Sequence, residues 1–270
     1  MHIRGLWRYP VKSMQGEACA EIELSGIGVT GDRSFGVLDV ASQTIISAKR
    51  DGRLLEASAR FAGPELLVTV PGQEELGPGA ALDQCLSSWL ERPVKLVPAP
   101  GYGTPTFEGP DDFEHEDAGH HRWEGESGSF VDESPLHLVT TANLAELALE
   151  RPDLQWDTRR FRPNMLVDAP PGALASPEPG LRILVGDVEL QVTKGCTRCV
   201  MTTRAQPATR AEPAAPTQSD SIERQLDVLR YLIAAHDNVV GFRAAVIRAG
   251  AVRVGDSVTV NTQAPVRATG

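Results

Sequence analysis

Short apolar runs separated by turn residues fill the first third of the chain. The runs cover residues 2–9, 20–24, 35–39, 66–70 and 94–97, with glycines and a Pro71–Gly72 pair between them. Apolar runs of this length, bounded by Gly and Pro, are typical of β-strands joined by tight turns. The first 97 residues are therefore predicted to form a small β-barrel or β-sandwich.

Segment 98–130 interrupts this pattern. It carries Pro, Gly and acidic residues with almost no apolar periodicity, and the acidic residues cluster at Asp111, Asp112, Glu114, Glu116 and Asp117. Such composition predicts a surface loop or linker, and the acidic, histidine-containing part at 108–126 is expected to be solvated. We accordingly predict domains at 1–98 and 131–262, with 99–130 as the linker.

The second half is predicted to mix strands and helices. A helix is expected over 141–150, because Pro152 would end it, and a strand is expected over 162–168. Segments 184–190 and 252–258 resemble each other, and each has the pattern of a strand, a Gly-Asp turn and another strand.

A second helix is predicted nearer the C-terminal end. Its apolar residues fall at helical spacing, and Asp220 with Glu223 would cap its start: Ile222, Leu226, Leu229, Leu232 and Ile233. The segment 204–218, rich in Ala, Pro, Thr and Gln, is predicted to be a flexible loop. It would serve either as a gate or as a solvated connector. Taken together, these patterns predict a mainly β fold of the α+β class.

Charge and composition narrow the class of partner. The chain has 36 acidic and 26 basic residues and a net charge of -10, which repels a phosphate backbone, so nucleic acid is not expected as a partner. No apolar run approaches the roughly 18 residues that cross a bilayer, and no leader pattern opens the chain. Four unevenly spaced cysteines do not suggest a disulfide framework. We therefore expect a soluble, cytoplasmic protein with no membrane partner.

The segment Cys196-Thr197-Arg198-Cys199 is open to several kinds of chemistry. A structural zinc site needs four ligands, and neither Cys19 nor Cys85 offers a second pair at the usual spacing. A thioredoxin-type pair would open a helix, whereas here a strand pattern precedes the cysteines and β-branched residues follow them. Nearby Lys and Arg residues would stabilise a thiolate able to bind a soft metal. Both cysteines could also simply be buried apolar residues.

Four motifs occur in order along the chain: Tyr9-Pro10-Val11-Lys12-Ser13 with Gly16, Gly31-Asp32-Arg33, Phe161-Arg162-Pro163-Asn164, and Cys196-Thr197-Arg198-Cys199. Together they resemble the MOSC-domain proteins with an N-terminal β-barrel, the group that contains the mitochondrial amidoxime reducing component and its bacterial relatives. The resemblance runs from residue 2 to about residue 260. It implies a barrel-like N-terminal domain and a MOSC β-barrel with a few flanking helices.

The resemblance also implies a site. In relatives the second cysteine of the C-x-R-C segment ligates molybdenum, which corresponds to Cys199 as metal ligand and catalytic residue. The pterin and its phosphate would be held by residues at matching positions: Lys12, Ser13, Arg33, Thr141, Arg162, Asn164, Thr197, Arg198 and Arg243. Relatives often carry Tyr or Asn at the position of Arg243. Arg160, on the same face as Arg162 if this stretch is a strand, is the weaker candidate.

The function implied by the resemblance is two-electron reduction of small N-hydroxylated compounds, such as amidoximes, hydroxylamines and N-hydroxylated bases. The cofactor would be molybdenum-molybdopterin. No haem, flavin or Fe–S motif occurs in the sequence, so a separate ferredoxin-like or cytochrome-type reductase is the expected electron donor. The alternative is a non-catalytic carrier of the molybdenum cofactor or a sulfur-transfer module, because MOSC domains also occur attached to cofactor sulfurases. A zinc or redox module would rest on the two cysteines alone.

Overall fold

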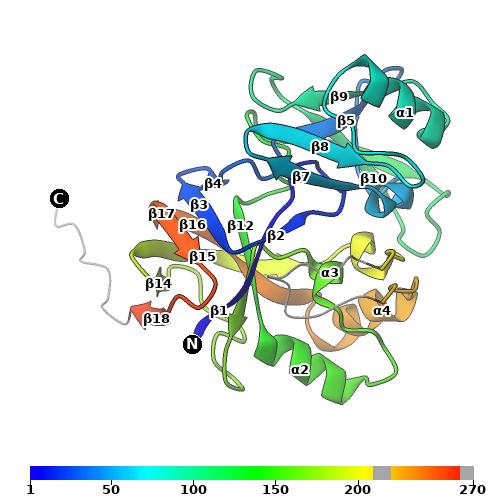
Figure 1. Ribbon diagram of the computed structural model, residues 1–270. Helices are drawn as coiled ribbons and strands as arrows, with labels where there is room; N and C mark the ends of the chain where they lie inside the picture. Colours follow the sequence, from blue (N-terminus) through cyan, green and yellow to red (C-terminus); the bar gives the residue numbers. More distant parts are fainter. Residues whose placement is uncertain (209–219, 262–270) are drawn as a thin grey trace, which may run out of the picture.

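The computed structural model describes residues 1–208 and 220–261, which form two lobes (Figure 1). The larger lobe is built on an eight-stranded sheet in the order β18-β14-β15-β16-β12-β13-β1-β2. Its strands are β1 (His2–Arg8), β2 (Glu17–Cys19), β12 (Leu136–Thr140), β13 (Met165–Asp168), β14 (Arg182–Val185), β15 (Val188–Thr197), β16 (Val239–Arg248) and β18 (Val258–Asn261). The predicted two-residue Gly186-Asp187 turn joins β14 to β15.

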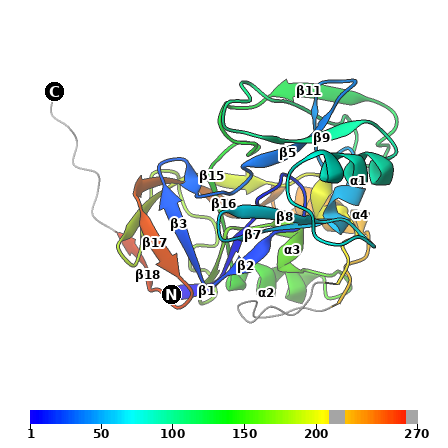
Figure 2. The same ribbon diagram turned by 45° about the horizontal axis from the view of Figure 1, so that its top comes forward.

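The smaller lobe holds a five-stranded sheet in the order β11-β10-β6-β5-β9 and a β7-β8 hairpin (Figure 2). The strands are β5 (Phe35–Asp39), β6 (Ile45–Ile46), β7 (Ser58–Ala62), β8 (Glu65–Thr69), β9 (Val94–Pro98), β10 (Thr106–Pro110) and β11 (His120–Glu124). A further sheet joins β3 (Glu21–Ser25) to β4 (Gly28–Val29) and to β17 (Gly250–Arg253). Strands outnumber the four α-helices of the described residues, so the predicted mainly β fold is confirmed.

The N-terminal strands pair with strands from the opposite end of the chain. β1 runs antiparallel to β13, with Leu6 opposite Met165, and β3 pairs with β17. Apolar side chains from both ends of the chain, including Ile3, Leu6, Leu138, Met165, Leu190 and Phe242, form one core cluster. Because strands from both sides of residue 98 share these sheets, the domain boundaries stay a prediction.

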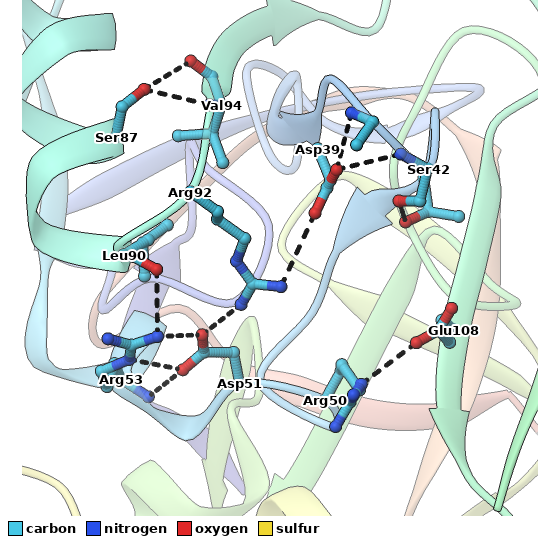
Figure 3. Close-up of polar contacts among 12 residues, drawn as sticks. Asp39, Ser42, Arg50, Asp51, Arg53, Ser87, Leu90, Arg92, Val94 and Glu108 are labelled. Carbon is cyan, nitrogen blue, oxygen red and sulfur yellow. Dashed lines mark hydrogen bonds and ion pairs between the residues drawn. The ribbon is translucent and has the colours of Figure 1, made fainter.

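Helix α1 (Ala80–Leu90), which the sequence patterns did not predict, packs Leu82, Leu86 and Leu90 into the core of the smaller lobe. It ends at Glu91, whose φ of 56° is left-handed, and Pro93 follows. Arg53, in the 3-10 helix η1 (Gly52–Glu56), donates Nη2 to the Leu90 carbonyl at 3.2 Å (Figure 3).

The carboxylate of Asp51 links that helix end to the sheet. It accepts hydrogen bonds from Arg53 and from Arg92, and the Arg92 Nη1 lies 3.6 Å from an oxygen of Asp39 (Figure 3). The pKa of Asp51 is lowered, because hydrogen bonds and charge from Arg53 and Arg92 outweigh the effect of burial, which would raise it. This ion-pair network therefore ties η1, the end of α1 and β5 together.

The helices of the larger lobe are α2 (Thr141–Glu150), α3 (Thr158–Phe161) and α4 (Leu226–Ala235), with the 3-10 helix η2 (Val200–Thr203). α2 has the predicted bounds, because Thr140 caps it by accepting the Asn143 N–H. The predicted start of α4 was wrong. Ile222 is bonded to Gln206 in an isolated β-bridge, and the helix begins only at Leu226 with no side-chain cap.

Segment 98–130 is not the structureless loop that was predicted. β10 and β11 form an antiparallel hairpin in the five-stranded sheet, and Phe107 is fully buried in a cluster with Ile45 and Phe130. The buried aromatic residues Phe107 and Phe130 are too far apart in the sequence to give a periodic pattern, which explains the error. Of the predicted flexible loop 204–218, residues 209–218 lie outside the described residues. No helix in the described ranges is long and apolar enough to span a bilayer.

Candidate functional site

The C-x-x-C segment lies where β15 ends and η2 begins. Thr202 donates its N–H and its hydroxyl to the Cys199 carbonyl at 3.0 and 2.9 Å. On the other side, Asn238 accepts the Arg198 N–H and donates to the Arg198 carbonyl, both at 2.9 Å. Cys196 is only 3% exposed, whereas Cys199 is half-buried. The backbone around Cys199 is therefore fixed, and its thiol is the more accessible of the two.

A pocket between the lobes brings this segment together with residues of the N-terminal motifs. Nine of the ten predicted site residues line it: Lys12, Ser13, Arg33, Arg162, Asn164, Thr197, Arg198, Cys199 and Arg243. Thr141 is not among the lining residues. It begins α2, and its hydroxyl donates to an oxygen of Asp168 at 3.0 Å.

The pocket is strongly basic although the chain is acidic overall. Six basic side chains line it against one carboxylate, that of Asp132: Lys12, Arg33, Arg160, Arg162, Arg198 and Arg243. Some are neutralised locally, since Arg33 pairs with Asp32, and Arg243 Nε lies 3.3 Å from Glu133. Three keep a buried nitrogen without a hydrogen-bond partner in the described residues: Arg162 Nη2, Arg198 Nε and Arg243 Nε, the last of which has Glu133 only as an ion-pair partner. Buried donors of this kind suit an anionic group.

Arg162 does not lie on a strand, so the prediction of a strand from 162 was wrong. Asp157 caps the short helix α3 by accepting the Arg159 N–H at 2.8 Å, and Arg162 ends that helix with a left-handed φ of 50°. β13 begins only at Met165. The expected alternation of Arg160 and Arg162 on one strand face therefore does not exist.

Two guanidinium groups stack on the ring of Tyr9. Arg162 Cζ lies 4.2 Å and Arg33 Cζ 4.4 Å from the ring centroid, and the Tyr9 hydroxyl donates to the Pro163 carbonyl at 3.0 Å. Burial, together with the charge of Arg33, lowers the pKa of Arg162 to about 10. Burial likewise raises the pKa of Tyr9 to about 12. The ring is a neutral platform for two cations.

The carboxylate of Asp132 pairs with two ammonium groups. Lys12 Nζ donates to Asp132 at 2.9 Å and to the Phe130 carbonyl at 2.8 Å, and Lys49 Nζ lies 3.3 Å from the same carboxylate. Burial lowers the pKa of Lys12 to about 8 despite the opposing effect of Asp132. Burial would raise the pKa of Asp132, but the two lysines hold it well below its usual range.

Arg160 and Arg204 hold the backbone around the site through hydrogen bonds to carbonyl groups. Arg160, 2% exposed, donates to four backbone carbonyls, including those of Thr202 and Arg204. Arg204 donates to the Ala48 and Lys49 carbonyls at 3.1 and 2.8 Å and forms an ion pair with Glu116 of the β10-β11 loop. The acidic loop thus contacts the segment that follows Cys199.

Sequence reasoning missed several lining residues, chiefly Asp132 and Ser134 just before β12 and His137 within it. The only signal for Asp132 and Ser134 in the sequence is a polar stretch directly before a buried strand, and His137 has none. Among the described residues, no cluster of three or more His, Cys, Asp or Glu side chains is arranged to hold a metal ion. The geometry therefore offers no assembled ligand set for the zinc alternative.

Comparison with known proteins matches almost the whole chain. The family model for the MOSC domain matches residues 125–259, and that for the MOSC N-terminal beta barrel domain matches residues 1–89. Human mitochondrial amidoxime-reducing component 1 is 27% identical over 286 residues, covering 94% of this chain and 81% of the human protein. The rat mitochondrial amidoxime reducing component 2 is 23% identical over 288 residues, with coverage of 94% and 81%.

Among solved structures, the YUAD protein from Bacillus subtilis aligns with a TM-score of 0.43 at 13% identity, over 95% of this chain and 93% of that chain. This likeness is too weak to add to the sequence matches.

Proposed function

This chain belongs to the MOSC-domain proteins with an N-terminal MOSC barrel, and from that premise we propose that it is a molybdenum-cofactor-dependent reductase of N-hydroxylated compounds. Its substrates would be amidoximes, hydroxylamines and N-hydroxylated bases. The names of its relatives, amidoxime-reducing components, support this reaction class.

The observation that carries the proposal is the pairing of an accessible thiol with unpartnered buried guanidinium nitrogens in one basic pocket. Cys199 offers a soft ligand for molybdenum, and Arg162 Nη2 and Arg198 Nε offer donors for the phosphate of the pterin. Arg198 Nη1 and Nη2 are already bonded to protein atoms, so Nε remains for a ligand. The donor set therefore fits a thiolate-bound, phosphate-bearing cofactor.

When bound, the cofactor supplies the two electrons that reduction of N–OH to N–H and water requires. The chain's own part is to bind, orient and supply protons. Lys12, with its pKa lowered to about 8, carries at Nζ a proton that it can release near neutral pH. Asp132 fixes that ammonium group in the pocket. Thr197, exposed at the end of β15 beside Cys199, is open to a substrate.

We propose a separate ferredoxin-like or cytochrome-type protein as electron donor. The cytoplasmic location stays a prediction, and the names of the relatives place those proteins in mitochondria.

The test is metal analysis of the chain produced in a host that makes the cofactor. The parent chain should contain close to stoichiometric molybdenum, Cys199→Ala should lose it, and the matched control Cys196→Ala should keep it. Zinc without molybdenum in the parent would refute the proposal.

Activity separates the reductase from the carrier. With a chemical reductant, molybdenum-loaded protein should convert benzamidoxime to benzamidine. Loaded protein that forms no benzamidine would instead support the alternative function of cofactor carrier or sulfur-transfer module.

A further inference from the structure

His137, on β12, contacts two of the arginines that keep unpartnered nitrogens, Arg198 and Arg162. Its Nε2 is 2.6 Å from Arg198 Nη2, and its Nδ1 is 3.4 Å from the Arg162 carbonyl oxygen. A guanidinium group has only donors, so Nε2 must accept the hydrogen bond from Arg198. Nδ1 then carries the proton and donates a hydrogen bond to the Arg162 carbonyl oxygen. Both ring nitrogens are thus satisfied in one neutral tautomer.

The surroundings of the ring oppose its protonation. His137 is 7% exposed, and burial followed by the charges of Arg198 and Arg243 lowers its pKa well below the usual value. Arg243 is its cross-strand neighbour on β16, and Arg33 acts in the same direction. A protonated ring would also place an N–H against the Arg198 guanidinium.

Gly241 gives the ring the space that this arrangement needs. Its φ of +69° is left-handed, and a Cβ there would lie 3.1 Å from His137 Nε2 and 2.3 Å from the Leu138 carbonyl oxygen. Any other residue would therefore crowd the backbone and approach the nitrogen that accepts from Arg198.

The contacts of Arg198 show what the histidine contributes. Nη1 donates to the Phe161 carbonyl at 3.2 Å, and Nη2 contacts both His137 and the Val240 carbonyl, while the group lies over the Phe161 ring. Held from several sides, the guanidinium has one orientation, and Nε is the nitrogen without a partner. Through Nδ1 the same imidazole also fixes the backbone at Arg162.

We propose that His137 is a positioning residue: as a neutral imidazole protonated on Nδ1, it holds Arg198 and Arg162 in the one arrangement in which Arg198 Nε and Arg162 Nη2 bind a phosphate-type anion. That the anion is the phosphate of the cofactor rests on the proposed function. The arrangement of the His137, Arg162 and Arg198 side chains does not depend on that function.

Three variants test the role of the ring. His137→Leu removes both hydrogen bonds at similar volume, and His137→Gln restores an acceptor for Arg198. His236→Leu is the matched control, because the His236 ring pairs with Glu150 on the surface. After production in a cofactor-synthesising host and dialysis, His137→Leu should retain about tenfold less oxidised, fluorescent pterin per protein than the parent, a factor typical of one lost charge-assisted hydrogen bond. His137→Gln should recover most of it, and His236→Leu should match the parent.

A spectroscopic readout keeps the proposal falsifiable if His137→Leu fails to fold. In ¹⁵N NMR of the parent at pH 7, the His137 ring should show the neutral tautomer with the proton on Nδ1. A ring protonated on Nε2, or a charged imidazolium, would overturn the proposal, as would full pterin retention in folded His137→Leu.

If the parent carries no cofactor, the proposed function fails and inorganic phosphate becomes the probe. Phosphate should then shift the side-chain Nε signals of Arg162 and Arg198 in the parent and not in His137→Leu. Unshifted signals in the parent would overturn the positioning role by itself.

Discussion

Arg160 and Arg162 are two positions apart in the sequence, yet their side chains make different contacts. Arg160 donates to backbone carbonyls at 2.7 to 3.3 Å, those of Gln155, Thr202, Arg204 and Glu223. Arg162 stacks on Tyr9, and its Nη2 has no partner within the described part of the chain. Replacing each in turn by Met, which roughly preserves the length of the side chain, separates a structural role from a binding role.

Arg160→Met leaves four carbonyls without this charged donor. Removing one partner from a buried charged network costs about 3 to 5 kcal/mol, and we expect the free energy of unfolding to fall by that amount. At roughly 2 to 4 °C per kcal/mol, the melting temperature should fall by about 6 to 20 °C. Because Arg160 touches η2, molybdenum content should fall as well.

Arg162→Met should behave differently in cofactor-free protein. Burial lowers the pKa of Arg162 to about 10, which means that folding disfavours its charged form. Since Met avoids this penalty, the free energy of unfolding should stay within about 1 kcal/mol of the parent or rise. Molybdenum content after production in a cofactor-synthesising host should nevertheless drop sharply, because a donor to the phosphate is lost.

Urea unfolding followed by far-UV circular dichroism measures both stabilities on cofactor-free protein, and metal analysis measures occupancy. If Arg162→Met destabilised the chain as much as Arg160→Met, or kept full molybdenum, the assignment of the two roles would be refuted.

Two further outcomes follow from the geometry of the pocket. Gly241→Ala should lower the free energy of unfolding by at least about 2 kcal/mol, because its Cβ would meet the Leu138 carbonyl oxygen at 2.3 Å. The control Gly63→Ala has a similar φ of +62° and open space around it, so it should cost only about 1 kcal/mol. Equal losses for the two variants in urea titrations would argue against the clash. Lys12 should add stability as pH rises from about 8 towards 10.5, because the unfolded chain keeps a proton that the folded chain has released. Lys12→Met should flatten that rise, and parallel stability–pH curves for parent and variant would contradict the lowered pKa.

Local patterning in the sequence determined many of the elements. β5 and α2 have the predicted bounds, and β1, β3, β8 and β9 lie within one residue of them. These segments alternate apolar and polar residues or carry their own cap, so their structure depends on near neighbours. The four motifs also pointed to most of the residues that line the pocket, through resemblance and not through spacing.

Elements that depend on distant contacts were not visible in the sequence. The β10-β11 hairpin packs Phe107 into a cluster with Ile45 and Phe130, and the strand predicted over 162–168 begins only at Met165, because Arg162 ends α3 with a left-handed φ. In the hairpin a tertiary contact outweighed the local pattern.

The hydrogen-bond partners of individual side chains were decided by the tertiary structure. Arg160, Arg162 and Arg198 have the same side chain, but Arg160 donates to backbone carbonyls, whereas Arg162 and Arg198 each keep one nitrogen without a hydrogen-bond partner in the described residues. His137 carries no motif and gains a role only because β12 lies between β13 and β16 in the sheet. The sequence by itself determined which charges the chain carries, and only the pairing of strands far apart in the chain decided which of them meet in a buried pocket, where low solvation makes an unpartnered donor a binding site.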